Sequence, residues 1–124
     1  MELLSRVASI SSPAVYFDPD NGQLTMSGES YPENTFEFYA PIISWLKTFI
    51  AEKDLAITLN LELAYLNTGS VKCLMDIFDL LEDAFQEGRK ISVIWLYHKK
   101  NSCALETAEE FSEDLTLPFQ IEAL

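Results

Sequence analysis

Residues 55–85 read LAITLNLELAYLNTGSVKCLMDIFDLLEDAF, and this stretch decides the fold. In its first part, leucine or isoleucine occupies every second position from Leu55 to Leu63, which predicts a β-strand with one apolar face. Behind it, apolar side chains return at steps of three and four residues, which predicts an amphipathic helix. We expect the buried stripe of that helix to comprise Val71, Leu74, Met75, Phe78, Leu81 and Phe85. A strand that passes directly into a helix is typical of the α/β class.

Toward the N-terminus, the sequence predicts a β-hairpin. Two short apolar runs, residues 14–17 and 23–28, flank turn residues that include Asn21-Gly22, a pair suited to positive φ. Residues 1–12 carry only scattered apolar side chains without a period, so we expect them to be loosely held.

A helix is predicted between this hairpin and the strand that begins at Leu55. Ser30 stands three residues before Glu33, which fits a capping box with Pro32 in the first turn. Apolar side chains then recur at helical spacing, and Lys53-Asp54 ends the pattern. The residues of this stripe are Phe36, Tyr39, Ile43, Leu46 and Ile50. Pro41 lies among them without a backbone donor, so we expect a kink or a break there.

Toward the C-terminus, the alternation of helices and strands continues. Gly88 stops the second helix, and residues 91–97 form an apolar run typical of a central strand covered on both faces. A helix over residues 104 to about 114 and a short strand over 118–122 follow. The order β-β-α-β-α-β-α-β predicts a single α/β domain over residues 1–124, a sandwich with a mixed, mostly parallel sheet and right-handed crossovers.

The composition narrows the classes of partner. The chain has 124 residues, of which 48% are hydrophobic, and 20 acidic against 8 basic side chains give a net charge of −12. That charge repels phosphate backbones and anionic lipids, so we expect neither nucleic acid nor a membrane as a partner, but proteins with basic patches. The N-terminus lacks the basic start and apolar core of a signal peptide, which predicts a cytoplasmic protein with Cys73 and Cys103 as free thiols.

The residues that usually carry catalysis or bind metals are sparse. His98 is the sole histidine, and the chain contains no CxxC, HxxxH or GxxxxGK[ST] pattern. The acidic positions Asp76, Asp79, Glu82 and Asp83 of the second predicted helix indicate a solvated face more than a cation site. We therefore expect no enzyme, no metal and no cofactor.

The junction Asn67-Thr68-Gly69-Ser70 allows two interpretations. In the first, Asn67 or Thr68 caps the helix, Gly69 eases the turn and Ser70 opens the helix. In the second, one hydroxyl accepts a phosphate, which unpaired backbone N–H groups and the positive end of the helix dipole would stabilise. A phosphate adds about −1.5 to −2 charge, so a partner complementary to the neutral hydroxyl would lose affinity without refolding of the domain.

At this junction the sequence resembles a known family over nearly its whole length. The matching segments are Phe17-Asp18-Pro19, Gly28-Glu29-Ser30-Tyr31-Pro32-Glu33-Asn34, Tyr65 to Ser70, Trp95-Leu96-Tyr97, Ala108-Glu109-Glu110-Phe111 and Leu117-Pro118-Phe119. They are similar to those of the SiaC family of bacterial regulatory phosphoproteins. The resemblance implies a fold like that of anti-sigma-factor antagonist (STAS) domains. It also implies a partner switch in which the unphosphorylated protein binds and activates a diguanylate cyclase.

The resemblance further implies which residue and which proteins operate the switch. Thr68 is the implied phosphoacceptor, a kinase and a PP2C-type phosphatase set its state, and cyclic di-GMP then controls aggregation and biofilm formation. The family commonly has serine where this chain has Gly69, and often an acidic loop where it has His98-Lys99-Lys100-Asn101, which bears on partner identity. The residues expected to contact partners are Tyr31, Glu33, Asn34, Tyr65, Asn67, Gly69 and Ser70.

Two other functions remain open from the sequence. An anti-sigma factor antagonist in a transcriptional partner switch would share Thr68 but bind a different partner. A small-molecule-binding or enzymatic domain that uses the acidic residues would need a deep pocket with convergent polar groups.

Overall fold

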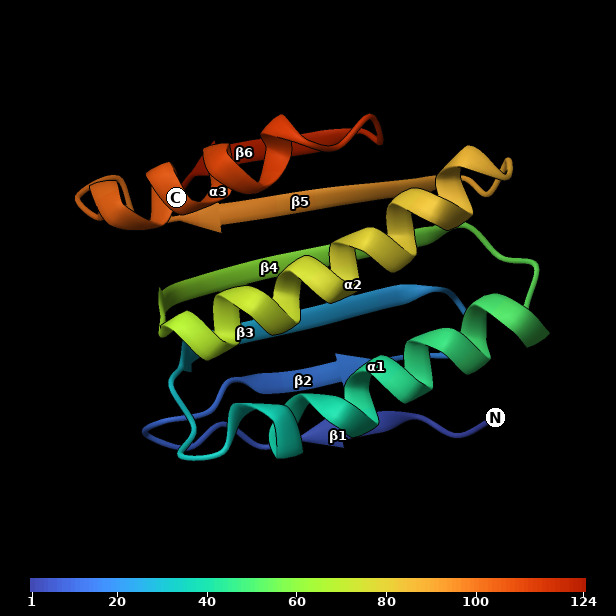
Figure 1. Ribbon diagram of the computed structural model, residues 1–124, viewed down its shortest axis with the longest axis horizontal. Coiled ribbons are helices and arrows are strands. Elements are labelled where there is room, and N and C mark those ends of the chain that lie inside the picture. Colours follow the sequence, from blue (N-terminus) through green and yellow to red (C-terminus); the bar gives the residue numbers. More distant parts are fainter.

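The computed structural model describes residues 1–124 as one six-stranded sheet and three helices (Figure 1). In chain order the elements are β1 Leu4–Arg6, β2 Ala14–Phe17, β3 Gln23–Ser30, α1 Thr35–Glu52, β4 Ile57–Leu66, α2 Thr68–Gln86, β5 Ile91–Tyr97, α3 Ser102–Glu113 and β6 Phe119–Ala123. The strands lie in the sheet in the same order, β1 to β6. The pairs β1–β2 and β2–β3 are antiparallel, and the three pairs from β3 to β6 are parallel. The predicted α/β fold with a mixed sheet is confirmed.

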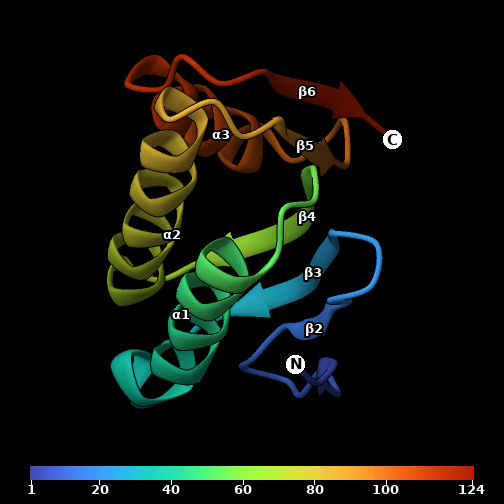
Figure 2. The same ribbon diagram turned by 90° about the vertical axis from the view of Figure 1, so that its right-hand side faces the viewer.

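All three helices cover one face of the sheet, and the other face is open (Figure 2). Each crossover from β3 onward leads to the next strand in one direction, so right-handed connections place every helix on the same side. The prediction that residues 91–97 are covered on both faces is therefore wrong. Along β5, Ile91, Val93 and Trp95 are buried under the helices, whereas Ser92 and Ile94 are only half-buried.

The core lies between the sheet and the helix layer. The parallel register sets Met26, Leu61 and Trp95 side by side on neighbouring strands, and all three are buried. Two side chains predicted for the core lie outside it: Phe36 is 76% exposed and Met75 is 49% exposed. The buried positions of α1 begin only at Tyr39, and Phe36 in the first turn instead lines a hollow between α1 and α2.

Three details near the N-terminus differ from the sequence prediction. Residues 4–6, expected to be loosely held, form β1, which pairs with β2 and buries Leu4. The predicted capping box does not form, because Ser30 ends β3 and Asn34 caps α1 instead. Helix α1 also runs through Pro41 without a break (Figure 1). Pro41 is exposed, so the Glu37 carbonyl that loses its intrahelical donor there is not sealed in the core.

The carboxylate of Glu82 on α2 holds the segment between α3 and β6. It accepts hydrogen bonds from the backbone N–H groups of Thr116 (2.9 Å) and Leu117 (3.1 Å), from the Thr116 hydroxyl, and from the Gln86 amide (2.8 Å). These donors favour the charged form, with the Thr116 hydroxyl first among them, and lower the pKa of Glu82 to about 2. Glu82, which the sequence placed on a solvated acidic face, thus stabilises the fold.

We expect Glu82→Gln to lower the midpoint of thermal unfolding at pH 7 by a few degrees, a modest change because the carboxylate is partly solvated. The folded-state pKa lies below the usual value of 4.5, so the stabilisation is complete above pH 4.5 and fades as the pH falls toward 2. Thermal unfolding of both proteins from pH 7 to pH 2 measures this. A difference that stays constant down to pH 2 would contradict this role of the carboxylate.

Candidate functional site

The two segments that carry the sequence motifs lie side by side where β3 and β4 end. Ser30 pairs with Leu66 in the sheet, and the Asn67 N–H donates to the Ser30 carbonyl at 2.9 Å. The rings of Tyr31 and Tyr65 meet edge to face with their centroids 5.9 Å apart. The strand ends thus bring residues 30–34 and residues 65–68 onto one rim of the sheet, a point that the sequence left open.

Asn67 caps α2 and leaves Thr68 free at the first helical position. The Asn67 side-chain oxygen accepts from the Ser70 N–H at 2.8 Å, and its carbonyl accepts from the Val71 N–H at 3.0 Å. This cap confirms one of the two residues predicted for it. The N–H groups of Thr68 and Gly69 have no protein partner, and the Thr68 side chain is exposed. A hydroxyl and two unpaired donors therefore meet solvent together at the positive end of α2.

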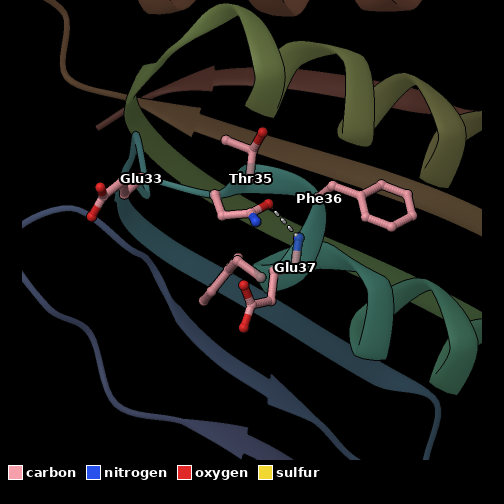
Figure 3. A pocket seen from close by; sticks show the side chains of 6 residues that line it. Glu33, Thr35, Phe36 and Glu37 are labelled. Carbon is pink, nitrogen blue, oxygen red and sulfur yellow. Dashed lines mark hydrogen bonds between the residues drawn. The ribbon is translucent and has the colours of Figure 1, made fainter.

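Helix α1 begins beside α2 with the same type of cap. The Asn34 side chain accepts from the Glu37 N–H at 3.0 Å, and its carbonyl accepts from the Phe38 N–H at 3.1 Å. The Thr35 side chain points toward α2, and the Phe36 ring lies largely exposed at the side of α1 (Figure 3). A Cβ atom at Gly69 would lie too close to the Thr35 hydroxyl and only 3.1 Å from its Cβ. Gly69 thus makes room for Thr35, and the two helix starts pack together.

A buried chain of hydroxyl groups holds the starts of the two helices in place from the core side. The Ser30 hydroxyl lies 2.7 Å from both the Tyr39 and the Ser70 hydroxyls, and the Ser70 hydroxyl donates to the Ser30 carbonyl at 3.0 Å. All three side chains are fully buried, and burial raises the pKa of Tyr39. The chain joins β3, α1 and α2, so it holds the start of α2 in place relative to both neighbours.

Ser70 therefore has a different role from the one predicted. It is 0% exposed, and its hydroxyl is engaged within the protein, so it offers no surface to a partner. The other expected contact residues are at least partly accessible around Thr68: Tyr31, Glu33, Asn34, Tyr65, Asn67 and Gly69. We call these six residues and Thr68 the helix-start surface. Phe36 borders it and was missed because its spacing placed it in the core.

The two largest hollows of the surface lie at the start of α1 and between α1 and α2. The largest, about 840 Å³, is lined by the six consecutive residues Glu33–Phe38 at the start of α1 (Figure 3). No group of three or more His, Cys, Asp or Glu side chains is placed to hold a metal ion. Cys73 is buried and Cys103 is exposed, and both are free thiols. None of the helices is both long enough and apolar enough to span a bilayer.

Comparisons with known proteins point to one family. The model of the SiaC family of regulatory phosphoproteins matches residues 7–124. An uncharacterised protein of Pseudomonas aeruginosa strain UCBPP-PA14 is 47% identical over 113 residues, which cover 91% of this chain and 90% of that protein.

Solved structures agree with this match. Apo-SiaC from Pseudomonas aeruginosa superposes with a TM-score of 0.95 at 45% identity, over 99% of this chain and 100% of that one. A second chain comes from the crystal structure of the diguanylate cyclase SiaD in complex with its activator SiaC, from the same species. It superposes with a TM-score of 0.94 at 45% identity, over 98% of this chain and 99% of that one.

Proposed function

The chain belongs to the SiaC family of regulatory phosphoproteins, and from that premise we propose that its unphosphorylated form binds and activates a diguanylate cyclase. It is a regulatory protein and not itself an enzyme. In this proposal a kinase phosphorylates Thr68 and a PP2C-type phosphatase removes the phosphate, in the cytoplasm. The output is cyclic di-GMP, and through it aggregation and biofilm formation.

The placement of Thr68 carries the proposal. Its side chain is exposed at the first position of α2, where a kinase can reach the hydroxyl without opening the core. The neighbouring hydroxyl of Ser70 is fully buried, so Thr68 is the accessible acceptor at this junction. This chain shares its fold, at 45% sequence identity, with the chain compared from the crystal structure of SiaD in complex with SiaC.

The geometry supports a switch that leaves the fold intact. A phosphate on Thr68 would lie beside the unpaired N–H groups of Thr68 and Gly69 and at the positive end of α2, which stabilise a dianion locally. The buried hydroxyl chain below needs no change, because it does not involve Thr68. Phosphorylation therefore alters the surface, and a partner that covers the neutral hydroxyl loses binding through desolvation and steric conflict.

The residues around Thr68 suit a protein contact. Tyr65 is 53% exposed and Phe36 is 76% exposed, and exposed aromatic side chains are common anchors of protein interfaces. Asn34 and Asn67 use their side-chain oxygens as helix caps, so their amide N–H₂ groups are free to donate to a partner. We expect the cyclase to cover Thr68 together with part of this helix-start surface.

A cyclase assay tests the proposal. The purified cyclase is incubated with GTP, with and without the unphosphorylated chain, and cyclic di-GMP is measured. We expect the chain to raise the rate severalfold and to bind the cyclase in calorimetry. A cyclase that neither binds the chain nor responds to it would contradict the proposal. Recovery of an anti-sigma factor instead of a cyclase in pull-downs from the native cells would favour the transcriptional alternative.

A further inference from the structure

A groove runs between α2 and α3 on the outer side of the helix layer. It encloses about 240 Å³ and is lined by Val71, Met75, Phe78, Asp79, Thr107, Glu110, Phe111, Asp114 and Leu115. Phe78 and Phe111 form its floor, with ring centroids 4.9 Å apart. We call this feature the α2–α3 groove. Its volume is below the roughly 300–1,000 Å³ of usual small-molecule sites, so its size suits an inserted protein side chain better than a metabolite.

The groove begins about one helical turn after the proposed phosphorylation site, Thr68, along α2. Residues three, four and seven positions apart share one side of a helix, so Thr68, Val71 and Met75 follow one another down α2. Val71 and Met75 line the groove, and Thr68 stands at its upper end. A partner that covers Thr68 can therefore continue into the groove without a gap. This continuity connects the groove to the helix-start surface.

The chemistry of the groove is apolar at the centre and acidic at the rim. Five of its nine lining residues are hydrophobic, and Met75 leaves 49% of its surface exposed there. The three charged residues are Asp79, Glu110 and Asp114, and no Lys or Arg lines the groove. Together with a net charge of −12 for the chain, this rim attracts a cationic segment.

On these grounds we propose that the α2–α3 groove docks a basic amphipathic segment of the diguanylate cyclase, which inserts one large apolar side chain against Met75 and Phe78. Lys or Arg residues that flank this anchor pair with Asp79, Glu110 and Asp114. The inference rests on the proposed function and specifies the chemistry of the partner. Flexible Met75 fits an anchor of irregular shape, since methionine adapts to its neighbours.

This arrangement is compatible with a switch at Thr68. Asp79 stands eleven residues after Thr68, which corresponds to about 16 Å along the helix axis. That separation exceeds the screening length of about 8 Å at physiological ionic strength, so a phosphate on Thr68 adds little attraction for a cation beside Asp79. The phosphate acts at the upper end of the groove, where it obstructs the partner.

Two variants of the groove test the inference, with affinity for the purified cyclase as the readout. Met75→Asp places a charge on the anchor site, and we expect it to weaken binding at least tenfold. The triple variant Asp79→Asn, Glu110→Gln, Asp114→Asn should weaken binding and flatten its dependence on salt between 50 and 300 mM NaCl. Tyr16→Asp is the matched control, because Tyr16 is 52% exposed on β2, on the open face of the sheet.

The outcomes separate this inference from the proposed function. Weakening by Met75→Asp with unchanged affinity of Tyr16→Asp supports the groove. If the wild type binds the cyclase and Met75→Asp binds within twofold of the wild-type affinity, docking in the groove is refuted. The proposed function then still stands. Equal salt dependence of the triple variant and the wild type overturns the basic partner. A cyclase that does not bind the wild-type chain overturns both the groove inference and the proposed function. If Met75→Asp loses self-association but keeps its affinity for the cyclase, the occupant of the groove is a second copy of this chain instead.

Discussion

The Thr68→Ala protein is expected to take up no phosphate from the kinase and ATP that phosphorylate the wild-type chain. Thr68 is the exposed hydroxyl at the start of α2, whereas the hydroxyl of Ser70 is engaged with Ser30 and fully buried. Replacing the Thr68 side chain should therefore abolish phosphorylation of the chain. Intact-protein mass spectrometry after incubation measures the phosphate that each protein has gained.

Thr35→Ala is the matched control for this experiment. Thr35 holds in α1 the position that Thr68 holds in α2, directly after an asparagine cap. The Thr35→Ala protein should be phosphorylated to the same extent as the wild type. Stoichiometric phosphorylation of Thr68→Ala would place the acceptor elsewhere and contradict the proposed switch.

A second large effect is expected for Thr68→Glu, which we predict to weaken binding to the cyclase at least tenfold. The carboxylate brings charge and bulk into the area that the cyclase covers, and its desolvation opposes binding. A carboxylate carries less charge and fewer acceptor oxygens than a phosphate, so the effect is smaller than that of phosphorylation itself. Calorimetry of the variant and the wild type with the same cyclase preparation measures the loss.

Thr68→Gln is the matched control for charge. It adds nearly the same bulk without the charge, so it separates the contribution of desolvated charge from that of size. We expect Thr68→Gln to bind between the wild type and Thr68→Glu. If Thr68→Glu binds as tightly as the wild type, the cyclase does not cover Thr68 closely.

The parts of the fold that the sequence predicted well are those with strict local periods. The alternation of apolar residues that begins at Leu55 predicted β4, and the helical period after Val71 predicted α2. Gly88, which predicted the end of α2, follows it with φ of +106°. The apolar run over 91–97 has the bounds of β5. Its exposure on the open face was not predictable locally, because it depends on the order of strands in the sheet.

The helix starts show where local patterns compete. Ser30 and Glu33 have the spacing of a capping box, but tertiary contacts won, because Ser30 is drawn into the buried hydroxyl chain with Tyr39 and Ser70. The actual caps are asparagines in all three helices: Asn34, Asn67 and Asn101. Only the middle one was predicted, since Asn67 alone directly follows a clear strand pattern.

For the candidate site, the sequence singled out residues but not their arrangement, and the roles of these residues stay predictions. Thr68 and its neighbours Tyr65 and Asn67 were singled out at the strand-to-helix junction, and the family resemblance assigned them a role. That Tyr31 contacts Tyr65 across the rim depends on the parallel register of β3 and β4, which no single segment encodes. The implied likeness to STAS domains stays a prediction.

Exposed apolar side chains were the main misassignment. The helical period placed Met75 in the core because periodicity records only the direction of a side chain, and Met75 points into the space between α2 and α3. When the apolar stripe of a helix is wider than the side of the helix that faces the sheet, its outer residues indicate a second apolar surface. Met75 thereby lines the α2–α3 groove.

The central claim is that one phosphate on Thr68 decides whether the chain binds its cyclase while the fold stays the same. Its most direct test is the affinity of stoichiometrically phosphorylated wild-type chain for the cyclase, measured before and after treatment with the phosphatase. We expect phosphorylation to weaken binding at least 100-fold, phosphatase treatment to restore it, and the circular dichroism spectrum to stay unchanged throughout. Equal affinity of the phosphorylated and dephosphorylated chains would contradict the claim.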